Sequence, residues 1–495
     1  MLAFVSRKVF IDSLGTELVG LSATMRNILG FLNLAELGIY TAVATSLYKP
    51  LFENDQKKVN ELISLFGFLY RIIGFVIFGI GIIVSLFLPT IFAKTELDFL
   101  ILYAAFYTFL TITLVSYFNN YKQVLLAANQ QTHVTTRLTN WVNITQVALQ
   151  IVYLKYLNGN YFGWLGIELL FGLGLRFWIN YTISQKYPWL KPDLSQGRAL
   201  MARNREVLAK VKQLFAHKLA GFVSQQSSNI LIYALTSLTV VTYYTNYLLI
   251  FQKVSVLISS TLGSNLAGIG HVIAENNKAT IHKVFWEFNA LFFWIAGIFV
   301  FSFYYLTEPF ISLWLGDEFI LSHLVLIIML INAYIFIIRN TAVYFLNAYA
   351  LFKDVWAPWA EAIMNLIISI AVGYYYGLIG VILGIAISTF LIESIWKPFF
   401  LFRDGFKEKF GYYLKHIIKY PALLILSWLI IYPLVHSGWL PEPLSYLNWF
   451  VFALCISIPF SILYGFLLFY GAPGMKNLFN RMIPIIAGRL HKSSR

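Results

Sequence analysis

Apolar residues occur in long runs that are separated by short polar segments. Runs of roughly 18 to 25 residues recur from end to end, and each can cross about 30 Å of hydrocarbon as a helix. A transmembrane β-barrel would instead show segments of about ten residues with alternating polarity. The pattern predicts fourteen membrane-spanning helices, at residues 1–14, 18–47, 61–92, 99–121, 138–157, 161–184, 216–236, 240–266, 284–306, 321–349, 358–376, 378–400, 417–435 and 446–470.

The first predicted span is unusually short. Residues 1–14 are too few to cross the membrane at about 1.5 Å per residue. Arg7, Lys8 and Asp12 interrupt the apolar core that a signal peptide would need. We therefore expect that the sequence starts inside its first helix, with part of that helix lying upstream.

The spans fall into two groups of six, followed by two more. The longest polar segment, at 185–215, separates the groups, and residues 471–495 form a basic tail. The prediction is an N-terminal six-helix lobe at 1–184, a basic cytoplasmic linker at 185–215, a C-terminal six-helix lobe at 216–400 and two extra helices at 401–470.

Two weak internal similarities support a duplication. The segment ENDQKKVNELISLFGF at Glu53 resembles ENNKATIHKVFWEFNA at Glu275, and GWLGIELLFGL at Gly163 resembles GLIGVILGIAIS at Gly377. Because each half would contain an even number of spans, the halves would share one orientation about an axis along the membrane normal. The predicted fold class is an all-α polytopic membrane protein with two pseudo-symmetric lobes.

Composition and charge placement agree with this class. The chain is 59% hydrophobic and 12% charged, with a net charge of +14. Of its 36 lysines and arginines, 28 fall in alternate loops and the tail, two in the opposite loops and six within predicted spans. This is the positive-inside pattern, so the C-terminus is predicted to be cytoplasmic. The basic residues therefore indicate topology and attraction to anionic lipid, and not a nucleic-acid partner.

Charged residues within the spans are the main functional signal. A charge in hydrocarbon costs at least about 2.5 to 3.5 kcal/mol, and such residues usually face protein or a water-filled cavity. At about 100° per residue, Arg26, Asn33, Glu36 and Tyr40 share a sector of roughly 80°. In the tenth span, Asn332, Arg339, Asn340 and Asn347 share about 100°. Two such stripes predict a polar cavity between the lobes.

An anionic ligand is the interpretation that we favour for this cavity. Arginines outnumber acids within the spans, and arginine suits bidentate binding of phosphate. Glu36 would pair with Arg26 or Arg71, whereas Glu361 and Glu393 are expected to lie at the membrane interface. The alternative is that these groups form ion pairs between helices without a ligand. The candidate substrate-binding residues are Arg7, Arg26, Arg71, Arg176, Arg339, Asn33, Glu36 and Asn332.

Other chemistry is not indicated. The histidines have no metal-ligand spacing, and no glycine-rich nucleotide motif occurs. The predicted outer loops are too short to hold an active site. We therefore expect no metal, no cofactor and no enzymatic activity.

The segments FLNLAELGIYTAVATSLYKPLFENDQKKVNEL, SNILIYALTSLTVVTYYTNYLLI, TLGSNLAGIGHVIAENN and GLIGVILGIAIS resemble the Wzx-type polysaccharide-biosynthesis flippases. These belong to the multidrug/oligosaccharidyl-lipid/polysaccharide (MOP) exporter superfamily, which includes the MATE transporters. The resemblance implies two six-helix lobes plus two C-terminal helices, and a cavity that opens alternately to either side of the bacterial inner membrane.

The cargo that the resemblance implies is an undecaprenyl-diphosphate-linked oligosaccharide for O-antigen, capsule or exopolysaccharide synthesis. Arg7 and Arg26 occupy fitting positions for its diphosphate. Implied partners are this substrate, membrane lipids and a glycan polymerase with its chain-length machinery. Two alternatives are a MATE-like drug/cation antiporter, which would want acidic cavity residues, and a membrane polysaccharide polymerase or glycosyltransferase, which would usually need a larger outer loop.

Overall fold

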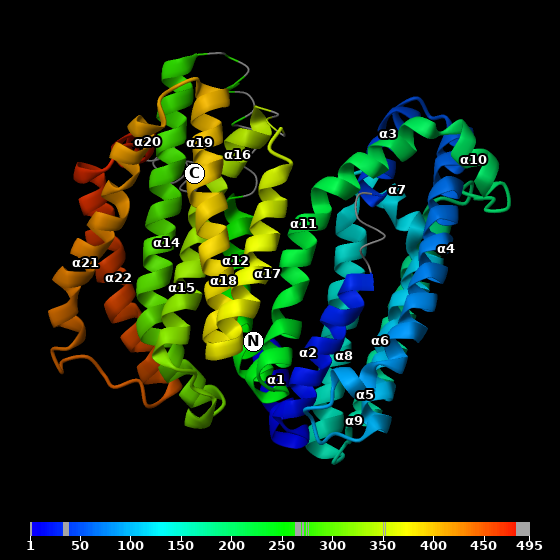
Figure 1. The fold of residues 1–495 in the computed structure, drawn as a ribbon, viewed down its shortest axis with the longest axis horizontal. Helices are drawn as coiled ribbons and strands as arrows, with labels where there is room; N and C mark the ends of the chain where they lie inside the picture. The colour runs from blue at the N-terminus through cyan, green and yellow to red at the C-terminus, as the bar shows by residue number, and fades with distance from the viewer. Residues whose placement is uncertain are drawn as a thin grey trace, which may run out of the picture. The chain divides into compact units, whose positions relative to one another are not determined.

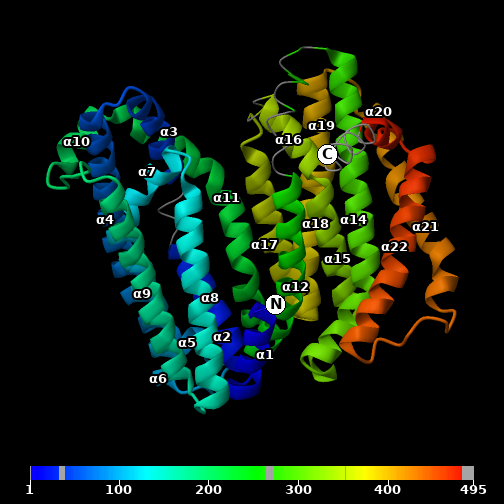
Figure 2. The same cartoon turned by 180° about the vertical axis from the view of Figure 1, so that it is seen from behind.

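The computed structural model describes residues 2–32, 39–262, 269, 272–273, 275, 277–349, 351 and 353–481. Its regular elements are all helices within these ranges (Figures 1 and 2). The chain forms two compact units, Met1–Thr245 and Asn246–Arg495. The predicted lobes at 1–184 and 216–400 were defined by counting spans, whereas these units are defined by compactness. The lobe boundaries therefore stay a prediction.

The first unit is coloured blue to green in Figure 1. Its helix α6 packs against α4 and α9, and α8 packs against α1 and α9. Its elements are α1 (Leu2–Leu14), α2 (Thr16–Leu32), α3 (Ile39–Phe52), α4 (Gln56–Leu86), α5 (Leu88–Ile91), α6 (Phe99–Asn119), the 3₁₀ turn η2 (Asn120–Lys122), α7 (Gln123–Ala128), α8 (Thr132–Tyr156), α9 (Tyr161–Lys186), α10 (Gly197–Arg203) and α11 (Arg205–Leu235). The division between the units falls inside α12 (Leu238–Leu262).

The second unit is built around one long central helix, α14 (Lys278–Trp314). It packs against α15, α16, α21 and α22, and the rings of Phe301 and Phe460 stack with centroids 3.8 Å apart. The other elements are η4 (Asp317–Phe319), α15 (His323–Ile338), α16 (Asn340–Ala348), α17 (Trp356–Tyr376), α18 (Leu378–Thr389), the π-helix η5 (Phe390–Trp396), α19 (Lys397–Phe400), the π-helix η6 (Leu401–Phe406), α20 (Phe410–Ile417), α21 (Lys419–Val435) and α22 (Tyr446–Gly471).

The helices confirm the predicted fold class of an all-α polytopic membrane protein. Within the described part of the chain, nine helices are long and apolar enough to cross a membrane. The other five predicted spans coincide with α1, α8, α11, α12 and the pair α2 and α3. Large apolar side chains on the outer helices are exposed, including Phe75 on α4 at 63% and Leu429 on α21 at 65%. Lipid tails would cover such surfaces in a membrane.

The internal repeat has a structural counterpart. Helix α4 begins at Gln56 and α14 begins at Lys278, 222 residues later, so each helix starts at the fourth residue of its similar segment. Both helices carry the same kind of N-cap, in which the side chain of Asp55 or Asn277 accepts a hydrogen bond from the backbone amide three residues on. The two starts are therefore equivalent in sequence position and in local chemistry.

The predicted linker differs from expectation because part of it is helical. Helices α10 and α11 occupy its second half, and α11 begins eleven residues before the predicted seventh span at 216–236. The sequence from Arg205 onwards, REVLAKVKQLF, consists mostly of good helix formers and has no glycine or proline. The apolar pattern marks only the part of a helix that would lie in lipid. It therefore underestimates the length of a helix, such as α11, that continues beyond the lipid.

The first half of the linker is bound to α4. The Asn60 side chain donates to Trp189 O at 3.4 Å and accepts from the Lys191 amide at 2.7 Å. One turn later, Ser64 Oγ accepts from the Asp193 amide at 2.9 Å. The side chains of α4 therefore take the place of water for the linker backbone.

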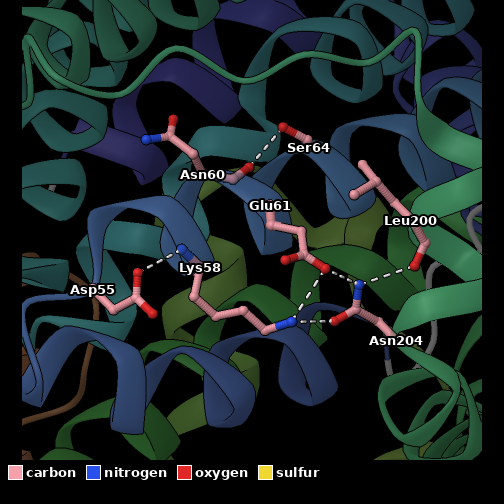
Figure 3. Close-up of polar contacts among 7 residues, drawn as sticks. All are labelled: Asp55, Lys58, Asn60, Glu61, Ser64, Leu200 and Asn204. Atoms are coloured by element: carbon pink, nitrogen blue, oxygen red, sulfur yellow. Dashed lines mark hydrogen bonds and ion pairs between the residues drawn. The ribbon is translucent and has the colours of Figure 1, made fainter.

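Asn204, between α10 and α11, completes this attachment (Figure 3). Its side chain is buried, donates to Glu61 Oε1 at 2.7 Å and accepts from Lys58 Nζ at 2.9 Å. Lys58 Nζ also donates to Glu61 Oε1 at 3.1 Å. The side chains of Lys58, Glu61 and Asn204 are therefore each hydrogen-bonded to the other two. Because the two bonds of Asn204 to Glu61 and Lys58 join residues more than 140 positions apart, they hold this segment to α4 within the first unit.

Close helix packing in the second unit leads to a first prediction. A Cβ atom on Gly380 of α18 would lie 2.3 Å from Gly373 N and 2.4 Å from Val372 C on α17. Small residues allow such close approach of membrane helices. We expect Gly380→Ala to lower the free energy of unfolding by about 1–3 kcal/mol, measured as a lower melting temperature in detergent. Gly79→Ala on α4, where nothing lies within 4 Å, is the matched control. Equal melting temperatures for both variants would contradict this packing.

Candidate functional site

Side chains from two helices of the first unit, α2 and α8, bind one carboxylate, Glu168 of α9. Arg26 Nη2 on α2 pairs with Glu168 Oε1 at 2.6 Å. Two side chains of α8, Gln146 and Gln150, donate to Glu168 Oε2 at 2.6 and 3.1 Å. The Arg26 guanidinium also lies 4.3 Å from the centre of the Phe109 ring on α6. The Glu168 side chain is 12% exposed and that of Arg26 is 50% exposed, so the arginine is held in place but still accessible.

Arg7 on α1 adds a second cation to this site. Its Nη1 atom is buried and has no hydrogen-bond partner among the described residues. Arg26 is near enough for the two positive charges to interact. The guanidinium groups of Arg7 and Arg26 and the carboxylate of Glu168 together carry a net charge of +1. Burying a hydrogen-bond donor without an acceptor also costs free energy. We call Arg7, Arg26 and Glu168 the arginine site.

Aromatic contacts hold α1 in its place beside this site. The Phe10 ring packs edge-on against Tyr161 and Trp164 of α9, with centroids 6.3 and 5.0 Å apart. The Tyr161 hydroxyl shares a 2.9 Å hydrogen bond with Ser22 Oγ on α2. Since Phe10 lies one turn after Arg7, these contacts also limit where Arg7 can move.

The remaining predicted residues of the first unit are placed differently. Arg71 is exposed on α4, next to the exposed side chains of Ile72 and Phe75. Arg176 on α9 is half-buried, and its Nε atom has no partner among the described residues. The structure therefore brings Arg7 and Arg26 together, whereas Arg71 belongs to an exposed surface of the unit. No ion pair joins Arg71 or Arg176 to a described acid.

Asn33 and Glu36 lie outside the described residues, and so does the expected pairing of Glu36 with Arg26 or Arg71. The described partner of Arg26 is Glu168, which the sequence interpretation missed. A signal for it was present, because Glu168 lies within the predicted span 161–184. The helical-wheel argument was applied to single helices and could not pair residues from two of them.

In the second unit, the predicted tenth span consists of α15 and α16, and the backbone stays helical at Arg339 between them, with φ −59° and ψ −25°. The Arg339 guanidinium lies 4.3 Å from the centre of the Phe336 ring. Asn340 donates to the carbonyls of Phe336 and Ile337, and thus binds the end of α15. Asn332 donates to Ile382 O on α18 at 3.2 Å. The asparagine amides are therefore engaged with backbone carbonyls.

Glu393, which was expected at the membrane interface, is buried inside the second unit. Its side chain is 4% exposed and lies in the π-helix η5, where Oε1 accepts from Lys397 Nζ at 2.5 Å. Arg339 Nη1 is 3.5 Å from the same oxygen. The positive charges of Lys397 and Arg339 stabilise the Glu393 carboxylate inside the unit. The position of Glu393 near the end of a predicted span did not reveal these contacts. Glu361 on α17 accepts from Thr389 Oγ1 at 3.3 Å and is partly buried.

No metal site is evident in the part of the chain that the structure describes. Within it, no three His, Cys, Asp or Glu side chains are grouped so that they could hold an ion. The carboxylates of Glu168 and Glu393 in the interior of the units instead form ion pairs and hydrogen bonds with arginine, lysine and glutamine side chains.

Comparison with known proteins identifies the fold. No protein-family model matches the sequence, and no curated protein is detectably similar to it. Among solved structures, the chain is similar to the lipid II flippase MurJ in an inward closed conformation, with 16% identity, a TM-score of 0.62 and coverage of 94% of this chain and 97% of MurJ.

A second similar structure is an inward-facing multidrug resistance transporter of the MATE family, in the MOP superfamily. It has 15% identity, a TM-score of 0.60 and coverage of 80% of this chain and 93% of the transporter. At this level of identity the likeness concerns the fold alone. The chain therefore has the helical membrane fold shared by a lipid II flippase and a MATE-family transporter of the MOP superfamily.

Proposed function

We propose that this protein is a flippase that moves an undecaprenyl-diphosphate-linked oligosaccharide across the bacterial inner membrane by alternating access. The arginine site supports the proposal, because a buried guanidinium nitrogen of Arg7, which has no acceptor within the described ranges, lies near a second arginine. A diphosphate supplies the acceptor oxygens and negative charge that this site lacks. The lipid tail would remain in the bilayer while the headgroup passes.

The same proposal covers orientation and partners. The positive-inside pattern places the C-terminus in the cytoplasm, so that transport would run from the cytoplasmic to the periplasmic leaflet. The substrate would belong to O-antigen, capsule or exopolysaccharide synthesis, and a glycan polymerase with its chain-length machinery would use the product. Such a transporter needs no catalytic residue and no cofactor, because it changes the location of its substrate and not its bonds.

A MATE-like cation antiporter is less well supported. A cationic drug would need a carboxylate to bind. Glu168 is already paired with Arg26 and two glutamines, and Glu393 is paired with Lys397 and Arg339. A cation would have to displace these partners at both places.

Reconstitution of the full-length protein into liposomes tests the proposal. The liposomes contain an undecaprenyl-diphosphate-linked tetrasaccharide with a terminal galactose, and membrane-impermeant galactose oxidase reports the outer-leaflet fraction. We expect the protein to make the inner-leaflet pool accessible, whereas protein-free liposomes keep it protected.

Two matched substrates make the test specific. The same tetrasaccharide on a monophosphate lipid should move much more slowly, because it offers the arginine site fewer acceptor oxygens and less charge. A fluorescent lipophilic cation should not be transported. Transport of the cation without the glycolipid would favour the antiporter, and equal rates for both phosphate forms would remove the arginine site from the mechanism.

A further inference from the structure

The short helix α20 of the second unit is amphipathic and leads into α21. Its Tyr413 side chain is buried against the unit, and the backbone stays helical through Ile418 into α21. Leu414 and Ile418, one turn apart, form an apolar stripe and are 49% and 67% exposed. Lys415 and Lys419 form a parallel stripe about 100° further round the helix, and both are exposed. This surface is therefore apolar on one side and basic on the other.

The chain that follows α22 brings a third lysine to the same part of the unit. The Tyr420 hydroxyl in the first turn of α21 donates to Pro473 O at 2.6 Å. A Cβ atom on Gly474 would lie 2.0 Å from Trp286 O on α14, and the Trp286 ring also packs against α20. Lys476, two residues after Gly474, is exposed. We call Lys415, Lys419 and Lys476 the lysine patch.

The acids near the lysine patch are engaged elsewhere. Glu408, just before α20, has its Oε1 atom 3.1 Å from His282 Nε2 on α14. Glu287, also on α14, pairs with Arg481 at 2.9 Å. Within the described ranges, no carboxylate forms an ion pair with a lysine of the patch. The patch therefore carries three positive charges that an external anion can neutralise.

The lysine patch lies where α21 is predicted to enter the membrane. The predicted span begins at residue 417, between Lys415 and Lys419, and the positive-inside pattern places this end on the cytoplasmic side. At that depth Leu414 and Ile418 reach acyl chains, and lysine side chains extend past an apolar surface to the headgroups. The cytoplasmic leaflet is also the one whose anionic lipids attract basic segments.

We infer that the lysine patch, together with Leu414 and Ile418, is a binding site for an anionic phospholipid of the cytoplasmic leaflet. The lysine ammonium groups bind the headgroup phosphate, and the two aliphatic side chains contact an acyl chain. Such a lipid holds α20 and the chain after α22 together at the membrane surface. The inference goes beyond the proposed function and does not depend on the cargo.

Lipid titration of the delipidated full-length protein, followed by native mass spectrometry, tests the site. We expect phosphatidylglycerol to bind more tightly than phosphatidylcholine with the same acyl chains. Lys415→Gln combined with Lys419→Gln should weaken phosphatidylglycerol binding by about 10- to 30-fold and leave phosphatidylcholine binding unchanged, because each lysine attracts the anionic headgroup. Lys57→Gln combined with Lys186→Gln removes two exposed lysines of the first unit and is the matched control.

Four results would overturn the inference. An unchanged phosphatidylglycerol affinity in the variant with Lys415→Gln and Lys419→Gln would exclude the site, and equal weakening in the control variant would mean that only net charge matters. Displacement of the lipid by inorganic phosphate at equal concentration would indicate a site for free anions. Displacement by undecaprenyl diphosphate would assign the surface to the cargo. Because no transport is measured, a failure of the proposed function would leave this test intact.

Discussion

Arg7→Gln is expected to reduce transport of the diphosphate lipid by about 10- to 100-fold, which corresponds to the loss of one charge-assisted hydrogen bond. The Arg7 Nη1 atom has no acceptor among the described residues, so the substrate would be its partner. Arg7→Lys should recover only part of the rate, because lysine keeps the charge but lacks the planar pair of donors. Rates are measured in liposomes at equal protein content.

Stability distinguishes a binding role of Arg7 from a structural one. A buried donor such as Arg7 Nη1, which has no acceptor among the described residues, destabilises the empty protein, so Arg7→Gln should keep or raise the melting temperature while transport falls. Lys155→Gln, at an exposed position near the end of α8, removes one positive charge elsewhere in the unit and should leave both quantities unchanged. A lower melting temperature in Arg7→Gln together with normal transport would show that Arg7 is structural.

Glu393→Gln is expected to lower the free energy of unfolding by about 2–4 kcal/mol. The substitution leaves Arg339 and Lys397 without their shared carboxylate, and both side chains are largely withdrawn from solvent, at 26% and 19% exposure. The lower end of the range applies if solvent reaches the two cations after the change. Thermal unfolding in detergent measures the loss, and the same assay at high salt should show little recovery because the pair is buried.

Removing all three charges tests whether the loss comes from unpaired cations. The triple variant with Arg339→Gln, Glu393→Gln and Lys397→Met should regain part of the stability, because no cation of the cluster is then left without its carboxylate, whereas Glu361 remains and loses two nearby positive charges. Glu318→Gln is the matched control, since Glu318 is exposed and has no described ion pair. A melting temperature of Glu393→Gln equal to that of wild type would mean that Glu393 does not hold α15, α16 and η5 together.

The candidate site could be predicted only in part from the sequence. Arg7 and Arg26 were recognised as costly charges within apolar runs, which is a local property. Their proximity was not derivable from spacing, because Arg7 and Arg26 lie on different helices. Glu168, 142 residues from Arg26, was missed for the same reason. Periodicity describes which residues share a face of one helix and says nothing about which faces meet.

Arg339 shows the corresponding limit in the second unit. The angular argument for Asn332, Arg339, Asn340 and Asn347 treats one helix at a time, and the backbone at Arg339, between α15 and α16, keeps helical angles. The argument could not show that Arg339 meets Glu393, because Glu393 lies on a separate element, η5.

By itself the sequence determined that this is a helical membrane protein, where its spans lie and that cationic groups lie within them. These properties follow from the transfer of each segment between water and lipid, which depends on local composition and helix geometry. Only the tertiary structure decided that Arg26 meets Glu168, that Glu393 is buried between two cations and that Asn204 fastens the linker to α4. Those pairings depend on packing between distant segments, and many arrangements of the same helices would satisfy the membrane equally well.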